Sequence, residues 1–123
     1  MSDKFATGMK VRRKVLGDAY VDRAEANKTA LDTPFQTLIT EAAWGTVWAS
    51  DAISLRERSM LTLALLAATG NFDEIPMHIR ATANTGASQE DVMEVFQHVA
   101  IYCGVPKANH AIKLAKQTFA EMG

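Results

Sequence analysis

The segment from Arg58 to Gly70 constrains the fold of this 123-residue chain more than any other, because apolar side chains occupy almost every side of a helix drawn through it. The preceding Ser54-Leu-Arg-Glu57 has the spacing of a capping box, which starts a helix, and Gly70 is of a residue type that ends one. A helix that is apolar all round must be covered by neighbours on every face. We therefore expect this helix to be the central element on which the rest of the chain packs.

The remaining apolar residues recur at intervals of three and four, and the sequence contains no alternating run of β-branched residues. Such spacing is typical of helices that bury one face. We predict further helices over residues 3–16, 19–30, 33–50, 71–86, 88–103 and 106–123. Because 48% of the residues are apolar, the chain can bury a core, and we predict an all-α fold: a compact bundle of about six to seven helices in a single domain over residues 1–123.

Charge and cysteine content exclude several classes of partner and chemistry. The 13 basic and 14 acidic residues give a net charge of −1, so no strong field favours nucleic acid or a membrane surface. No apolar run reaches about 18 residues, and no segment has the pattern of a signal peptide. Cys103 is the single cysteine, so neither an internal disulfide nor a Cys-x-x-Cys pair can form. We expect a protein of the reducing cytoplasm.

The segment from Asn71 to Gly86 is the first candidate for a functional site. Its sequence predicts one helix, capped near Asn71 and with Pro76 in the first turn, where a missing N–H costs nothing. Glu74 and His78 are then four residues apart, so their side chains share one face. A carboxylate and an imidazole beside the free N–H groups of a helix start can hold an anion and move a proton.

A second candidate lies in the predicted helix over residues 33–50. Glu41, Trp44 and Trp48 are spaced three and four residues apart, so helical periodicity puts them on a common face. Two large aromatic side chains with a carboxylate at one end can wall a pocket. Tryptophans at helical spacing are more often core or subunit contacts, however, and Gly45 between them indicates close packing against another helix. Both interpretations stay open at this point.

Two further groups of side chains could take part in binding. Glu94, His98 and Tyr102 follow one another at steps of four, although a histidine in an otherwise apolar helix is more often a core or interface residue than a catalytic one. Arg56 and Arg58 lie near the start of their helix, where a cation opposes the helix dipole. Each arginine therefore needs a carboxylate partner or an anionic ligand.

The sequence contains no metal-binding or nucleophilic motif. His78, His98 and His110 lie on three different segments, without a His-x-x-x-His pair. Neither a Gly-x-Ser-x-Gly elbow nor a dinucleotide or Walker fingerprint occurs. We therefore predict no metal and favour cofactor-free acid–base chemistry, with His78 and His98 as titrating groups and Arg58 or Arg80 as anchors for an anion.

Several segments together carry a family resemblance that extends over almost the whole chain. They are Gly8–Gly17, Ala43–Trp48, Arg58-Ser59, Asp73–Ala81, Asn84–Gly86 and His98–Asn109. The set resembles the carboxymuconolactone decarboxylase family of the alkylhydroperoxidase D-like superfamily, which implies small all-helical subunits that use no cofactor and assemble, typically as hexamers. Redox members of the superfamily carry a Cys-x-x-Cys before the histidine. Asn71 and Glu74 stand at those positions here, so we expect no peroxide or disulfide chemistry.

The resemblance implies cofactor-independent decarboxylation of a small anionic lactone, 4-carboxymuconolactone, to 3-oxoadipate enol-lactone in the catabolism of protocatechuate. Because the unsaturated lactone accepts the electron pair left by carbon dioxide, the substrate supplies its own electron sink. We assign the proton to His78, with Glu74 orienting the imidazole or raising its pKa. The proposed substrate-binding residues are Arg58, Arg80 and His98 for carboxylates, Trp44, Trp48 and Tyr102 as pocket walls, and Glu41 in an unassigned role.

Two other interpretations of the sequence remain. A relative with the same fold could act on another small lactone or keto acid, because the motif does not define the substrate. Alternatively, the chain could be a non-catalytic helical assembly protein in which Glu74 and His78 form a salt bridge between subunits. Turnover of a panel of lactones distinguishes these interpretations.

Overall fold

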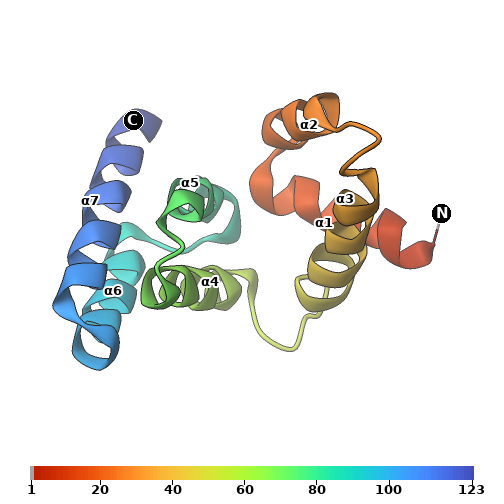
Figure 1. Cartoon of the computed structure of the whole chain (residues 1–123). Coiled ribbons are helices and arrows are strands. Elements are labelled where there is room, and N and C mark those ends of the chain that lie inside the picture. The colour runs from red at the N-terminus through yellow and green to blue at the C-terminus, as the bar shows by residue number, and fades with distance from the viewer. Residues whose placement is uncertain (1) are drawn as a thin grey trace. The chain divides into compact units, whose positions relative to one another are not determined.

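Helices account for all the regular structure in the computed structural model, which describes residues 2–123 (Figure 1). The elements are α1 (Asp3–Leu16), α2 (Asp18–Asn27), α3 (Thr33–Ile39), the π-helix η1 (Thr40–Val47), α4 (Leu55–Thr69), the short 3-10 helix η2 (Phe72–Glu74), α5 (Ile75–Thr85), α6 (Gln89–Cys103) and α7 (Val105–Met122). No strand occurs in residues 2–123, so the predicted all-α fold is confirmed.

The helices group into two units, Met1–Ser54 and Leu55–Gly123. The first unit contains α1, α2, α3 and η1, and the second contains α4 to α7 with η2. The single domain over residues 1–123 stays a prediction. No helix within residues 2–123 combines the length and the apolar character that a membrane crossing requires.

The second unit is built around one apolar cluster to which each of its α-helices contributes. The buried members are Leu63 and Ala67 from α4, Ile75 and Ile79 from α5, Val92, Val95, Phe96 and Val99 from α6, and Ala108, Ala111 and Ala115 from α7. Helix α4 packs against α5 and α6, but its Leu61 and Leu65 remain 54% and 63% exposed. The expectation that this helix is covered on every face is therefore wrong for the chain by itself, because its unit places neighbours on only part of its surface.

An ion pair fastens the start of α4 to the start of α6. Arg56 donates from Nε to Asp91 Oδ2 (2.8 Å) and from Nη2 to Asp91 Oδ1 (2.6 Å). Asp91 also accepts a hydrogen bond from the Ser88 backbone N–H (2.9 Å), and Ser88 Oγ accepts one from the Asp91 N–H (3.0 Å). This capping box confirms Ser88 as the predicted start of α6. The ion pair also explains why Arg56 is stable near a helix start.

Unfolding at low pH tests the Arg56–Asp91 pair. The hydrogen bonds from Arg56 hold the pKa of Asp91 well below its usual range, so the pair stabilises the fold fully above about pH 4 and loses this effect as the pH falls through the lowered pKa. Asp91→Asn should therefore show a smaller loss of unfolding free energy than the wild type between about pH 4 and pH 2. Urea unfolding measures this, with Glu90→Gln as the control. Equal pH dependence in wild type and Asp91→Asn would contradict a stabilising role for the pair.

In the first unit, two glycines allow the backbones of α1 and η1 to touch. A Cβ atom on Gly8 would overlap the carbonyl oxygen of Thr40 and lie 2.9 Å from the Gly45 nitrogen. A Cβ atom on Gly45 would overlap the Lys4 carbonyl oxygen. Backbone atoms cannot rotate away from such a contact, so only glycine fits at both positions.

The predicted helix over residues 33–50 is only partly α-helical, which corrects the sequence prediction. It begins at Thr33 as expected, with Pro34 in the first turn, but turns into a π-helix at Thr40. Two bonds that reach five residues back accompany the wider turn: Trp48 N–H to Ala43 O (2.8 Å) and Thr46 Oγ1 to Glu41 O (2.9 Å). The π-turn coincides with the close contact to α1, a tertiary feature that the apolar spacing does not encode.

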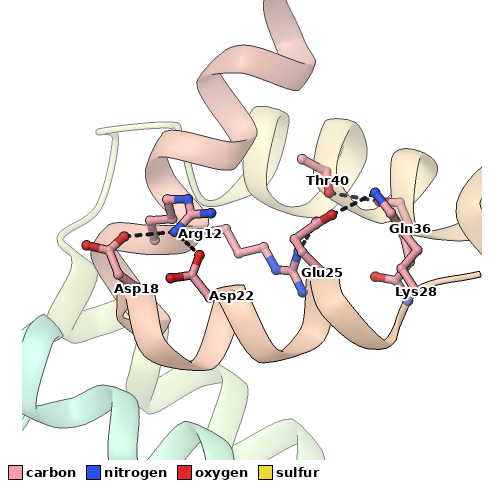
Figure 2. A network of polar contacts seen from close by, with 8 residues as sticks. Arg12, Asp18, Asp22, Glu25, Lys28, Gln36 and Thr40 are labelled. Carbon is pink, nitrogen blue, oxygen red and sulfur yellow. Dashed lines mark hydrogen bonds and ion pairs between the residues drawn. The ribbon is translucent and has the colours of Figure 1, made fainter.

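Charged side chains join α1 to α2 in the first unit, and Figure 2 shows this network. Arg12 is buried on α1 and donates from Nη1 to Glu25 Oε1 on α2 (3.2 Å). Lys28 Nζ lies 2.6 Å from the second oxygen of Glu25 and lowers the pKa of that carboxyl, against the opposing effect of partial burial. Arg13 pairs with Asp18 (3.1 Å) and Asp22 (2.9 Å). These cations are therefore engaged within the unit.

Substitution of Gly8 tests the α1–η1 contact. Alanine favours a helix over glycine by about 1 kcal/mol, so an open site would gain stability from Gly8→Ala. Because the new Cβ meets the Thr40 carbonyl oxygen, we expect the substitution to lower the unfolding free energy by about 3 kcal/mol instead. Urea unfolding followed by circular dichroism measures the change. Thr7→Ala, at the exposed neighbouring position, should leave stability almost unchanged, and a Gly8→Ala variant as stable as this control would refute the contact.

Candidate functional site

His78 lies on α5 and is buried, with 8% of its surface exposed. Ile75 and Ile79 on the same helix are fully buried in the apolar cluster. Removing the imidazole from water penalises its charged form, so burial lowers the pKa of His78 from the ordinary 6.5 to about 4. The ring is therefore neutral at pH 7 in the unliganded chain.

The position of Glu74 differs from the one that a single helix over residues 71–86 would give. The predicted helix over residues 71–86 is divided, because η2 comes first and α5 begins only at Ile75. Glu74 is thus the exposed N-cap residue of α5, and its side chain makes no capping hydrogen bond. Burial lowers the pKa of His78, so the alternative in which Glu74 raises this pKa is wrong, whereas the orienting role of Glu74 stays a prediction. The other end of the prediction is confirmed, since Gly86 caps α5 in the left-handed conformation.

A strip of buried polar side chains runs along α5 from His78. Thr82 and Thr85 follow it at four and seven residues and are only 4% and 8% exposed. Thr82 Oγ1 donates to the Ile79 carbonyl oxygen (2.6 Å), and Thr85 Oγ1 lies 2.7 Å from Ser59 Oγ of α4. Sequence reasoning missed both threonines. The spacing of His78, Thr82 and Thr85 indicates that they share one face of a helix. The sequence does not show that this face is buried.

The remaining candidates in the second unit are on its surface or partly exposed. His98 and Tyr102 share a face of α6 as predicted, with stacked rings 4.9 Å apart, and Tyr102 is 76% exposed. Arg80 is exposed and pairs with Glu121 of α7 (2.6 Å). Arg58 is half-buried in the first turns of α4. Within this unit, His98 and Tyr102 therefore form an exposed pair on α6.

The three candidates of the first unit lie on or directly after η1. Trp44 and Trp48 are buried, with ring centroids 5.1 Å apart and planes tilted by 32°. Glu41 accepts a hydrogen bond from the Ser2 hydroxyl, whose oxygen in turn caps the Phe5 N–H at the start of α1. The tryptophans are therefore core residues of their unit, and Glu41 helps to hold the α1 start.

The described residues offer little to hold a metal. No group of three or more His, Cys, Asp or Glu side chains gathers in residues 2–123. A surface hollow of about 380 Å³ lies between α6 and α7 and is lined by Gln89, Met93, Ala115, Lys116, Phe119 and Ala120. None of these is a predicted site residue.

Residues 33–117 match the sequence profile of the Carboxymuconolactone decarboxylase family, so the chain belongs to this family. The match confirms the resemblance drawn from the motifs and extends from the first unit into the second. It covers α3 through most of α7, including His78 and the polar strip of α5.

Two relatives are similar over nearly the whole chain. A 4-carboxymuconolactone decarboxylase of Acinetobacter baylyi is 35% identical over 120 residues, covering 98% of this chain and 90% of that protein. The nitrosuccinic acid decarboxylase npaB of Metarhizium robertsii is 39% identical over 118 residues, covering 96% of this chain and 82% of that protein. Both relatives are decarboxylases, and their names give two different substrates.

Titration of His78 tests its burial. Its side-chain NMR signals should titrate near pH 4 in the folded chain. Because the folded pKa lies below the unfolded value, the unfolded chain binds more protons between these two values, so stability from this group is complete above about pH 6.5 and is lost as the pH falls to about 4. The wild type should lose about 3 kcal/mol of unfolding free energy over this interval that His78→Gln does not lose. His98→Asn, at an exposed position, should behave as the wild type. A His78 signal that titrates near pH 6.5 would refute the assignment.

Proposed function

We propose that this protein catalyses the cofactor-independent decarboxylation of a small diacid, with 4-carboxymuconolactone, converted to 3-oxoadipate enol-lactone, as the first candidate substrate. The observation that supports this most strongly is near full-length similarity to two decarboxylases within one family. Formation of the enol-lactone would place the reaction in aromatic catabolism.

The substrates in the names of the two relatives carry the same arrangement of groups around the carbon that loses carbon dioxide. In each, the carbon that loses carbon dioxide also carries a CH2–COO⁻ arm and is bonded to an electron-accepting group, the C=C–C=O unit of the lactone or the nitro group. The broken C–C bond leaves its electron pair on that group, as a furan-like dienolate in the lactone or as a nitronate in nitrosuccinic acid. One proton then adds to the ring carbon next to the lactone carbonyl in the lactone, or to the carbon that lost carbon dioxide in nitrosuccinic acid. Because the substrate holds the electrons, the protein needs to supply only binding, desolvation and a proton.

His78 is our proposed proton donor, and its neutrality in the free chain fits this role once substrate charge is considered. A carboxylate within a few ångström favours the imidazolium and raises the pKa of a histidine. Binding of the diacid would therefore draw a proton onto His78, and the loss of carbon dioxide would leave a carbanion equivalent to receive it. The acid is thus charged only when substrate is present.

The other site roles remain part of the proposal. Arg58 is the preferred anchor for the leaving carboxylate because it is half-buried on α4, the helix that packs against α5. Arg80 is the second candidate anchor and is paired with Glu121 in the structure. Glu74 is retained as an orienting group. The further proposed substrate contacts are His98, Tyr102, Trp44, Trp48 and Glu41.

We also propose self-association, as a homohexamer. The described part of each unit exposes large apolar side chains that a partner would cover; in the second unit these include Leu61, Leu65, Ile101, Tyr102 and Val105. Light scattering measures the subunit number directly. A monomer at micromolar concentration would refute association.

A direct assay decides between substrates. Purified protein is incubated separately with 4-carboxymuconolactone and with nitrosuccinic acid, and released carbon dioxide is measured together with the ultraviolet spectrum. Turnover of the lactone supports the first candidate. Turnover of nitrosuccinic acid alone supports the second candidate, which the 39% identical relative favours. Inertness towards both acids and towards related lactones supports a non-catalytic assembly protein.

Removal of the imidazole tests the role of His78. His78→Ala should lower kcat by about 10²- to 10⁴-fold, the usual effect of losing a general acid. His110→Asn, an exposed histidine of α7 outside the proposed site, is the matched control and should retain wild-type turnover.

The pH profile of the wild type gives a second readout of the same role. Because kcat/KM reports the ionisation of His78 in the free enzyme, kcat/KM should fall as the pH rises above about 4. The value of kcat reports His78 in the substrate complex, so kcat should begin to fall only at a higher pH. Near wild-type turnover by His78→Ala, or identical pH limits for the two parameters, would contradict the assignment.

A further inference from the structure

Thr85 differs from the other buried threonines in where its hydroxyl proton can go. Thr40, Thr82 and Thr118 are each buried and donate to a backbone carbonyl oxygen three or four residues earlier in the chain, at 2.8, 2.6 and 2.8 Å. Thr85 makes no such bond in residues 2–123, and its hydroxyl contact is with Ser59 Oγ at 2.7 Å. The hydrogen bond that the other three threonines make to a backbone carbonyl is therefore missing at Thr85.

The Ser59–Thr85 pair holds one proton more than its internal hydrogen bond uses. Each hydroxyl has one donor, so the pair has two protons, and one of them lies between the two oxygens. Ser59 is completely buried, whereas Thr85 keeps 8% of its surface exposed, the same fraction as His78. Buried hydroxyl donors are nearly always satisfied in folded proteins. If Ser59 donates to Thr85, the hydroxyl proton of Thr85 stays available for another acceptor. This proton lies on the partly exposed residue of the pair.

The position of Thr85 relative to His78 defines what could receive this proton. Seven residues make almost two full turns of α5, so the two side chains share a face and are separated by about 10 Å along the helix axis. A hydrogen bond of about 3 Å at each end leaves about 4 Å between the atom facing His78 and the acceptor facing Thr85. A carboxylate oxygen lies at about that distance from the carbon that bears a CH2–COO⁻ arm.

We propose that Thr85, held in place by Ser59, binds the carboxylate of the substrate's CH2–COO⁻ arm while His78 faces the carbon centre that reacts. This inference rests on the proposed function and adds a substrate class to it: diacids in which the leaving carboxylate and a CH2–COO⁻ arm share one carbon. Thr85 is a binding residue in this scheme. Ser59 is a positioning residue, because it acts by directing the Thr85 proton.

Binding of unreactive acids tests the inference without requiring turnover. Succinate serves as the diacid probe and butyrate as a probe of equal chain length with one carboxylate, each titrated against the protein by NMR. Thr85→Val should weaken succinate binding by about 10- to 100-fold, the effect of losing a hydrogen bond to a charged group, and leave butyrate binding unchanged. Thr85→Ser should bind succinate as the wild type does, and Ser59→Ala should show a smaller, succinate-specific loss.

Thr118→Val is the matched control, because it makes the same substitution at a buried threonine that donates to its own helix. It should bind both probes as the wild type does. Equal losses for succinate and butyrate in Thr85→Val, or no succinate binding to the wild type, would overturn the inference. A succinate-specific loss in a protein that decarboxylates neither candidate acid would uphold the carboxylate site and refute the proposed function. If Thr85→Val decarboxylates the substrate as fast as the wild type at low substrate concentration, the proposed function is upheld and the carboxylate site at Thr85 is refuted.

Discussion

Burial of a histidine within the second unit is the physical constraint on which the proposed function of this chain depends. The apolar residues beside it, Ile75 and Ile79, belong to the core, so the imidazole loses most of its contact with water. Desolvation penalises the charged ring and lowers its pKa to about 4. In the proposed mechanism, a base held neutral in this way gains its proton when the negatively charged substrate binds. The same burial that costs stability at low pH would therefore couple protonation of His78 to the binding of an anionic acid, as the proposed function requires.

The rest of the second unit holds that histidine in a defined place. Helices α4, α5, α6 and α7 share one apolar cluster, and the Arg56–Asp91 pair joins the starts of α4 and α6. The Ser59–Thr85 contact adds a polar link between α4 and α5 within an otherwise apolar surface. Buried polar groups cost stability unless they are hydrogen-bonded. The hydroxyl pair of Ser59 and Thr85, at the face that carries His78, is therefore the basis for the proposed binding role. The proposed binding of a second carboxylate follows from this arrangement.

Sequence periodicity predicted most of the fold because helix boundaries depend on local chemistry. Pro76 and Gly86 mark the first turn and the end of α5, and Ser88 caps α6 through its own backbone contacts. Periodicity failed at η1, where the turn widens beside the Gly8–Gly45 contact with α1. That contact joins residues far apart in the chain, so no window of neighbouring residues contains it.

The sequence by itself determined that the chain is helical, which residues begin and end most helices, and which family it belongs to, because caps, prolines, glycines and motifs act locally or as recognisable strings. The tertiary structure alone decided the environment of each candidate side chain. It buried His78 and paired Thr85 with Ser59, while it left Tyr102 exposed on the same helix that carries His98. Burial and pairing depend on which elements meet in space, and the chemistry of an imidazole or a hydroxyl follows from those neighbours rather than from its position in the chain.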